Sequence, residues 1–151
     1  MHIHIGYDNP DEETNLAIIK TLDLFLGIPS IILDKDTKRR ELYGKAGCFR
    51  HKKYGVEYRT LSSFWLSSPV LIEWAAINTF NALGSLNGGF KISKEDEEVI
   101  ENTINTNDTS TAYMLLEKYN INLPTDKLKK DYNYNLVYYH GVSVSTEKAT
   151  V

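Results

Sequence analysis

The side chains best suited to chemistry lie in two short segments of the chain, one at its start and one near residue 55. The first holds two imidazoles, on His2 and His4. The second is crowded with cations and contains one carboxylate, Glu57, two residues before Arg59. Imidazoles and carboxylates are ligands for divalent metal ions, and guanidinium groups bind phosphate and carboxylate oxygens. These residue types are the set that a combined metal and phosphate site requires.

The two histidines are predicted to share one face of a strand. Residues 2–6 alternate polar and apolar side chains, with Ile3 and Ile5 on the opposite side. His2 and His4 can therefore reach one ion, or one can ligate it while the other holds a phosphate oxygen. A surface strand that carries histidines without any chemical role has the same pattern, so the pair alone does not establish a metal site.

A second strand is predicted to place Glu57 and Arg59 on a common side. Residues 45–51 and 54–61 read as a hairpin that turns near Lys52, and side chains two apart on a strand share a face. In the functional interpretation Glu57 ligates a divalent cation and Arg59 binds an anion. For these two residues taken alone, a structural ion pair is the simpler interpretation.

Arg50 follows a stretch with two glycines, Gly44 and Gly47, which permit close approach of the backbone to a ligand. The stretch is not the phosphate-binding loop of nucleotide triphosphatases, because no Gly-Lys-Ser or Gly-Lys-Thr opens a helix there. Arg39 or Arg40 is a candidate to act with Arg50 on an anion.

Composition sets the broad class of the protein. With 151 residues, of which 42% are apolar and 25% charged, the chain is expected to form one domain with its own core. Cys48 is the single cysteine, which rules out an internal disulfide and a cysteine-based zinc cluster and indicates a reducing, cytoplasmic setting. No apolar run approaches the length of a membrane span, so no membrane partner is expected.

The charge of the chain is uneven. Its net charge of -3 argues against a nucleic-acid partner, yet nine of its seventeen Lys and Arg residues lie between Lys35 and Arg59. A local cationic patch on an acidic protein indicates an anionic ligand. For the lysines in this stretch, a solvated surface is the simpler interpretation.

The spacing of apolar residues predicts an α+β fold, in which three or four helices cover a small antiparallel sheet. The first helix is predicted to be capped at Asn9 and to end at Gly27 and Pro29. Another is predicted over residues 68–86, with Ser68 as its cap and its end near Gly84. We expect it to turn these side chains inward: Ile72, Ala75, Ala76, Thr79, Phe80 and Leu83.

Further helices are predicted over residues 93–105, where Ser93 and Asp96 form a capping pair, and over residues 109–119. The alternation over residues 132–140 permits a terminal strand. Residues 143–151 are expected to be frayed.

Together and in this order, the motifs resemble the glutamine-synthetase-like carboxylate–amine ligases, or amidoligases, and in particular the type 2 ligases of bacteriophages. The resemblance rests on the histidine strand, the glycine stretch that leads to Arg50, and the strand that holds Glu57 and Arg59, and it lies mainly within residues 1–85. It implies a curved antiparallel sheet that bears the active site and helices packed behind it. It also implies a reaction in which ATP and magnesium convert a carboxylate to an acyl phosphate, from which an amine displaces phosphate.

The resemblance also implies roles for individual residues. His2 and Glu57 correspond to metal ligands, and His4 corresponds to a contact with the nucleotide phosphates. Arg59 corresponds to the arginine that meets the substrate carboxylate or the transferred phosphoryl group, and Arg50 to a phosphate-binding arginine. A further positive charge is expected from Arg40 or Lys45.

By comparison with these ligases, the chain is expected to lack the N-terminal part that carries acidic metal ligands and further strands. We therefore expect residues 1–142 to be the C-terminal part of a ligase catalytic domain that holds half of the site. Three explanations are open: a split enzyme whose N-terminal half is a separate chain, a truncated reading frame, or a degenerate relative. An unpaired sheet edge would also favour homo-oligomers.

The substrates expected from the resemblance are a small-molecule or peptide carboxylate and an amine. The first alternative function is a non-catalytic module that binds an anion or serves a structural role. A metal hydrolase built on His2 and His4 ranks last, because the sequence offers no obvious further ligands.

Overall fold

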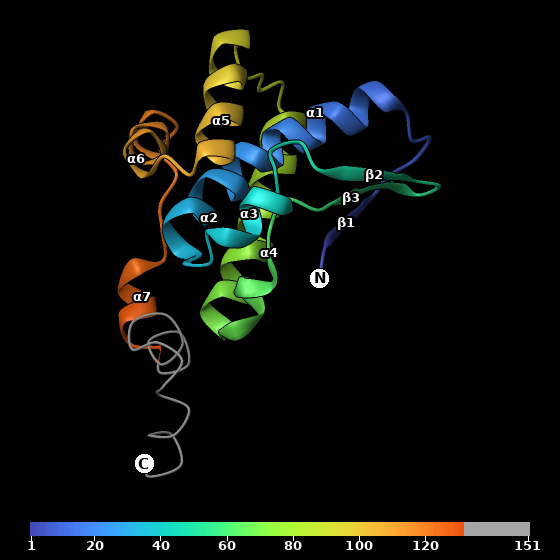
Figure 1. Ribbon diagram of the computed structural model, residues 1–151. Coiled ribbons are helices and arrows are strands. Elements are labelled where there is room, and N and C mark those ends of the chain that lie inside the picture. Colours follow the sequence, from blue (N-terminus) through green and yellow to red (C-terminus); the bar gives the residue numbers. More distant parts are fainter. Residues whose placement is uncertain (132–151) are drawn as a thin grey trace.

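The computed structural model describes residues 1–131. These residues form a small sheet that lies to one side of a group of helices (Figure 1). The fold is thus a mixture of helices and an antiparallel sheet, as the sequence predicted. The terminal strand predicted over 132–140 and the tail 143–151 lie outside the described residues.

The sheet has three strands, β1 (Ile3–Gly6), β2 (Phe49–Lys52) and β3 (Gly55–Tyr58). Their spatial order is β1-β3-β2, and both pairings are antiparallel. The predicted hairpin is confirmed, since β2 and β3 are consecutive and turn at residues 53–54. Among the described residues, β1 pairs with no strand other than β3, so it forms one edge of the sheet.

The first helix, α1 (Glu12–Leu22), begins later than predicted. Its cap is Asp11, whose side chain accepts a hydrogen bond from the Thr14 backbone N–H at 2.8 Å. Asn9 instead has a φ of 52°, which places it in the turn before the helix. Asp and Asn are equally good helix caps, so the sequence alone does not distinguish Asn9 from Asp11. The turn before the helix places Asp11 at the cap position.

The helix does not end at Gly27 and Pro29, contrary to the prediction. It continues through a π-helical segment, η1 (Asp23–Gly27), into α2 (Ile28–Leu33). The Ile28 N–H bonds to the Asp23 carbonyl five residues earlier, and this wider turn gives the ring of Pro29 room in the helix. Gly27 is explained by packing, because a Cβ there would lie 2.8 Å from the Ile104 side chain.

The helical run from Glu12 to Leu33 is long and apolar enough, by length and composition, to cross a membrane. The expectation that no apolar run reaches this length was therefore wrong. Because 72% of its most apolar window is buried inside the protein, the run has the surroundings of a core helix. Its residues face both apolar clusters of the protein, one beneath the sheet with Ile5 and Val56 and one toward Ile100 and Ile104.

Two short helical turns flank the second and third strands. α3 (Lys38–Leu42) lies in the charged stretch before β2, and the 3-10 turn η2 (Ser63–Ser67) follows β3. The next helix, α4 (Pro69–Asn87), is capped by Ser68 as predicted, but it continues past Gly84. A glycine within an exposed helix costs only about 1 kcal/mol, which is not enough to end it.

The inward face predicted for α4 was largely wrong. Ala75 is buried, but Ile72 and Phe80 are 45% and 75% exposed. The helix instead buries Leu71 and Trp74. Because α4 has apolar residues on more than one side, their spacing alone does not identify the face that packs on the core.

The remaining helices are α5 (Lys94–Thr106), α6 (Thr109–Lys118) and α7 (Thr125–Lys129). The first two confirm the predictions, including the Ser93 cap, whose hydroxyl accepts from the Asp96 N–H at 3.2 Å. α7 was not predicted. α5 and α6 pack against α2 and the π-helical segment, on the side away from the sheet (Figure 1).

Candidate functional site

The two faces of the sheet differ in chemistry. Ile5, Val56 and Tyr58 point toward the helices and belong to the apolar cluster beneath the sheet. Because side chains alternate along a strand, the residues between them point away from the helices. We call this outer surface the polar sheet face, and it consists of His2, His4, Arg50, Lys52, Glu57 and Arg59.

The strand register aligns three of these residues in one row. His4 on β1 and Arg50 on β2 are both directly opposite Glu57 on β3. Directly opposed residues of antiparallel strands project to the same face. The row therefore brings an imidazole, a carboxylate and a guanidinium together across the sheet, although they are far apart in sequence.

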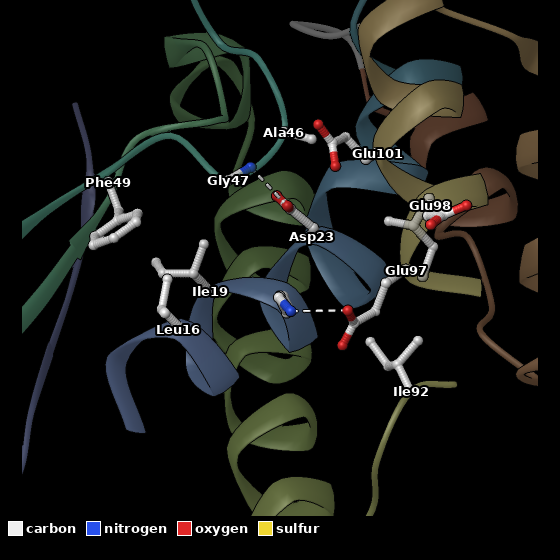
Figure 2. Close-up of a pocket in the computed structure, with 12 residues that line it drawn as sticks. Leu16, Ile19, Asp23, Ala46, Gly47, Phe49, Ile92, Glu97, Glu98 and Glu101 are labelled. Atoms are coloured by element: carbon white, nitrogen blue, oxygen red, sulfur yellow. Dashed lines mark hydrogen bonds and ion pairs between the residues drawn. The ribbon is translucent and has the colours of Figure 1, made fainter. Parts of the chain in front are cut away.

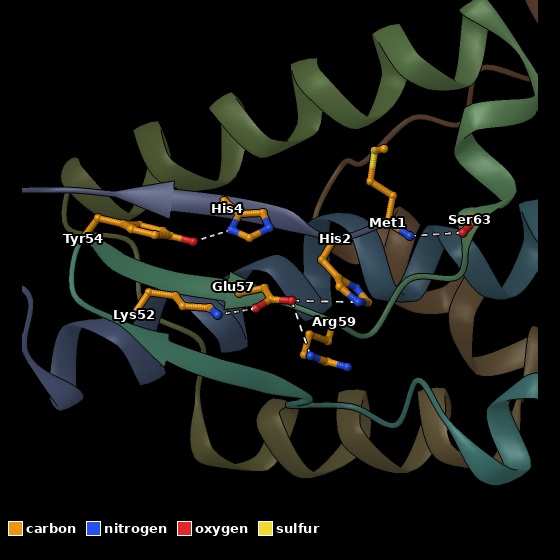
Figure 3. A network of polar contacts seen from close by, with 8 residues as sticks. All are labelled: Met1, His2, His4, Lys52, Tyr54, Glu57, Arg59 and Ser63. Atoms are coloured by element: carbon orange, nitrogen blue, oxygen red, sulfur yellow. Dashed lines mark hydrogen bonds and ion pairs between the residues drawn. The ribbon is translucent and has the colours of Figure 1, made fainter.

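Glu57 is the centre of the polar sheet face (Figure 3). One carboxylate oxygen, Oε1, lies 3.8 Å from Nε2 of His2 and 3.4 Å from Nη1 of Arg59. The other, Oε2, lies 3.2 Å from Nζ of Lys52. The predicted convergence of His2, Glu57 and Arg59 is thus present, and the Glu57 side chain is only 6% exposed.

The charges around Glu57 keep it ionised. Burial by itself raises the pKa of the Glu57 carboxyl, but the hydrogen bond and charge of Lys52 and the charge of Arg59 outweigh burial, and His2 adds to their effect when its ring is protonated. The pKa therefore lies below its ordinary value. At neutral pH this residue is a carboxylate held between cations.

The surroundings of His2 favour its uncharged form. Burial and the positive charges of Arg59 and the chain's amino terminus lower the pKa of the His2 imidazole, with Glu57 opposing them. The ring is therefore neutral at pH 7, which is the form that can ligate a metal ion or accept a hydrogen bond. Its Nδ1 is buried and has no hydrogen-bond partner within residues 1–131.

His4 lies on the exposed part of the same face and contacts Tyr54, with its Nδ1 close to the phenol oxygen. Arg50 is also exposed. Lys45 lies outside the strands, in the stretch before β2, and its side chain is exposed while its carbonyl accepts a hydrogen bond from Thr60 at 2.9 Å.

The structure does not bring Arg40 to the polar sheet face. Its guanidinium is buried, and Nη2 donates to the Ser30 hydroxyl at 3.0 Å. Its neighbour Arg39 instead lies against the glycine stretch, where a Cβ on Gly44 would meet Arg39 Nη1. The charge of Arg39 also lowers the pKa of His2. Of these two arginines, Arg39 is therefore the one whose charge affects His2.

Sequence reasoning missed two further members of the site, Lys52 and Tyr54. Lys52 lies two residues after Arg50 on the same strand, so the alternation rule applied to β2 would have found it. Tyr54 had no comparable signal, because it belongs to the turn and reaches His4 only after β1 pairs with β3.

The described residues do not form a complete metal cage. No group of three or more His, Cys, Asp or Glu side chains within residues 1–131 is placed to hold a metal ion. Both oxygens of Glu57 already face cations. Mg²⁺ is commonly held by one or two carboxylates together with substrate phosphates, and Glu57 is the one side chain of this face that offers a carboxylate within residues 1–131.

Comparison with known proteins adds one finding. A family model described as "Phage phiEco32-like COOH.NH2 ligase-type 2" matches residues 1–136. The match extends well beyond the segment that holds the motifs and includes all of the described residues. No curated protein matches the chain, and no solved structure does.

Proposed function

This chain belongs to the phage phiEco32-like COOH.NH2 ligase-type 2 family, and we propose that it joins a carboxylate to an amine in an ATP-dependent reaction on the polar sheet face. The family's name indicates a carboxylate–amine ligase. The proposal adds the cosubstrate, the surface and the roles of the residues.

The observation that carries the proposal is the convergence of His2, Lys52 and Arg59 on the single carboxylate of Glu57. With Arg50 on the same face, the fixed positive charges outnumber the negative one. A cationic surface with one carboxylate suits a polyanion such as a triphosphate, because lysine and arginine bind phosphate oxygens with charge-assisted hydrogen bonds.

In this proposal Arg59 and Arg50 bind the transferred phosphoryl group and the substrate carboxylate. Their planar guanidinium groups can donate two parallel hydrogen bonds to either anion. His4 and Lys45 contact the phosphates of the nucleotide. Arg40 has a structural role, because its guanidinium binds Ser30. Arg39 supplies the further positive charge that the sequence had assigned to Arg40 or Lys45.

The reaction proceeds in two displacements. An oxygen of the substrate carboxylate forms a bond to the terminal phosphorus of ATP, and the bond from that phosphorus to the bridging oxygen breaks, which releases ADP. The amine then forms a bond to the acyl carbon, phosphate leaves with the acyl C–O electron pair, and the amine nitrogen loses a proton. The arginines lower the barrier by stabilising negative charge on the phosphoryl oxygens.

His2 and Glu57 are the residues that would hold Mg²⁺, which supplies charge screening at the phosphates. When phosphate oxygens arrive, Lys52 and Arg59 can exchange their contacts with Glu57 for contacts with phosphate. The carboxylate is then free to serve as a ligand. The ion pairs therefore keep Glu57 in place until the nucleotide binds.

The alternative function, a non-catalytic anion-binding module, is favoured by one observation. The described residues place one carboxylate on the polar sheet face, and its pKa is held low by cations. Such a face binds an anion without needing a metal ion. The two functions differ in whether magnesium strengthens nucleotide binding.

The proposal is tested with Arg59→Gln, which keeps a side chain of similar length without the charge. We expect wild-type protein to bind ATP in the presence of Mg²⁺, as measured by calorimetry. The variant should bind at least about tenfold more weakly, because a charge-assisted hydrogen bond contributes roughly 1.5–3 kcal/mol. Lys94→Gln, which removes an exposed cation from α5, is the matched control and should bind like wild type.

The chemical step is measured with hydroxylamine, which traps an acyl phosphate as a hydroxamate. Glutamate, aspartate and short peptides serve as the carboxylate, and ADP release is followed in parallel. Hydroxamate formation by wild type that Arg59→Gln abolishes would support the ligase reaction. Equal ATP binding by wild type and Arg59→Gln would contradict the proposed site.

A further inference from the structure

A buried carboxylate lies directly behind the central strand. Asp23 is the first residue of the π-helical segment and is 5% exposed. Its Oδ1 accepts a hydrogen bond from the Tyr58 hydroxyl at 2.7 Å and one from the Thr60 hydroxyl at 3.3 Å. Its Oδ2 accepts from the Gly47 backbone N–H at 2.7 Å (Figure 2). The proposed reaction uses none of these groups.

The residues that Asp23 holds, Tyr58 on β3 and Thr60 just after it, alternate with the residues of the site. Tyr58 and Thr60 point inward, whereas Glu57 and Arg59 point to the polar sheet face. Along a strand the two sets share one backbone, so fixing one set fixes the height and direction of the other. Asp23 therefore acts on Glu57 and Arg59 through the strand.

Asp23 also fixes the glycine stretch that leads into β2. It binds the Gly47 N–H, and Thr60 donates to the Lys45 carbonyl at 2.9 Å. Both contacts lie within five residues of Arg50. The network thus joins three parts of the site: the end of β3, the residues around Lys45, and the start of β2.

We propose that Asp23 is a positioning residue of the polar sheet face, which holds β3 and the glycine stretch in the register that anion binding requires. The ligand part of this inference rests on the proposed function. The structural part, that Asp23 sets the geometry of Glu57 and Arg59, does not.

The protonation of Asp23 changes which hydrogen bonds form in this network, and this change can be measured. The Thr60 hydroxyl has one proton but two acceptors within reach, Lys45 O at 2.9 Å and Asp23 Oδ1 at 3.3 Å. A protonated Asp23 can donate to Thr60, which then donates to Lys45, whereas an ionised Asp23 competes with Lys45 for that proton. The protonation of Asp23 therefore changes the contact that holds the glycine stretch.

The pKa of Asp23 lies in a pH range where its protonation can be measured. Burial raises its pKa to about 7, against the hydrogen bonds from Tyr58, Gly47 and Thr60 and the charge of Arg40. It also lines a cavity of about 250 Å³, through which protons can exchange with solvent. The other ionisable groups around that cavity are Lys20, Glu97, Glu98 and Glu101 (Figure 2).

The first measurement needs no ligand. In a ¹H–¹⁵N NMR titration from pH 5 to pH 9, we expect the amide signals of Gly47, Glu57 and Arg59 to move with a common midpoint. Asp23→Asn should remove this shared transition, with only the shifts caused by His2 remaining in both proteins, while the circular dichroism spectrum stays that of a folded protein. Asp34→Asn is the matched control, because Asp34 is an equally buried carboxylate that instead holds Ser62.

The second measurement uses ATP with Mg²⁺ as the probe. Asp23→Asn should weaken binding by about tenfold, which corresponds to one weakened charge-assisted hydrogen bond to the bound anion. Asp34→Asn should change binding less than twofold. Tyr58→Phe removes one hydroxyl only, so it gives the same comparison if Asp23→Asn fails to fold, and it should also weaken binding.

Two results would overturn the inference. One is a folded Asp23→Asn or Tyr58→Phe protein whose ATP affinity equals that of wild type. The other is an amide of Glu57 or Arg59 that titrates identically with and without the Asp23 carboxylate. If wild type itself does not bind ATP, the proposed function fails, and the NMR comparison still decides whether Asp23 positions the strand.

Discussion

At the scale of single residues, the site depends on Glu57 more than on any other group. It is a carboxylate with very little exposed surface that three basic side chains approach from different strands and ends of the sheet. Removing one partner from such a cluster leaves the remaining buried charges less well compensated. The charge of Glu57 therefore affects how the face is held together and, in the proposed function, what it binds.

Glu57→Gln separates the ligase from the anion-binding module. In a ligase, Mg²⁺ should strengthen ATP binding to wild type, and the variant should lose that enhancement because an amide is a poor ligand for a hard cation. Without Mg²⁺, the variant should bind ATP about tenfold more tightly, since one negative charge near the phosphates is gone. Calorimetry with and without Mg²⁺ gives both values.

Glu117→Gln, on the exposed surface of α6, is the control for the loss of one negative charge. If Mg²⁺ has the same effect on wild type and on Glu57→Gln, then Glu57 is not a metal ligand. If Mg²⁺ has no effect on either, the anion-binding module is the better description.

The alternation rule was sufficient to predict which side chains share the polar sheet face, because it needs only the correct strand positions. It placed His2 with His4 and Glu57 with Arg59. It could not choose between Arg39 and Arg40, because these adjacent residues lie in α3, a short helix that was not predicted. In a helix the two point about 100° apart, so one is buried beside Ser30 and the other faces the glycine stretch.

At the scale of elements, the approach of β1 to β3 is very close at Gly55. Its φ is 150°, and a Cβ built there would lie 2.0 Å from the carbonyl oxygen of Ile5. The contact is with backbone, which cannot rotate away as the end of a side chain can. The pairing that brings His4 opposite Glu57 therefore depends on the absence of a side chain at this position.

Gly55→Ala should consequently destabilise the protein by roughly 3 kcal/mol, because it adds both a steric conflict and an unfavourable backbone conformation. Chemical denaturation measures this loss. Gly84→Ala is the contrasting variant, since Gly84 lies in α4 with open space around it, and it should stabilise by about 0.5–1 kcal/mol. A Gly55→Ala protein as stable as wild type would show that β1 does not pair as described.

Two errors in the predicted elements have a common cause. Gly27 with Pro29 is an ordinary signal for the end of a helix, and Gly84 is a weaker one. Each was overruled by contacts with distant residues, since Gly27 lies against Ile104 and α4 packs along the core through Leu71 and Trp74. Local signals predict helix ends only when the tertiary structure does not compensate for their cost.

At the scale of the whole molecule, Asp23 links the site to overall stability. Its carboxyl has a pKa of about 7 in the folded protein, raised by burial from 3.8. Between these values the native state retains a proton that the unfolded chain has released. Stability from this group is therefore present at low pH and is lost as pH rises toward 7 and above.

Asp23→Asn should abolish this loss. As pH rises from 4 to 8, the unfolding free energy of the variant should improve relative to wild type by roughly 4 kcal/mol. Urea unfolding at several pH values measures the difference, and comparing the two proteins at each pH cancels the contribution of His2. Parallel stability curves for the two proteins would show that Asp23 is ionised in the folded state throughout this range.

The contacts of Asp23 could not be predicted from the sequence. It appeared as one acid among apolar helical residues, with no motif around it. Its partners Tyr58, Thr60 and Gly47 come from segments more than twenty residues away. The spacing of residues along one segment does not predict these contacts, which form only when the π-helical segment packs beneath β3.

The row His4–Glu57–Arg50 has a consequence for how this protein can evolve. Since the same four-residue strands supply apolar side chains to the core and charged ones to the polar sheet face, the loss or gain of one residue in β1 or β3 would exchange the two roles. Ile3 and Ile5 would then meet water while the imidazoles entered the interior. Related chains should therefore keep the lengths of these strands, with insertions and deletions confined to the turns.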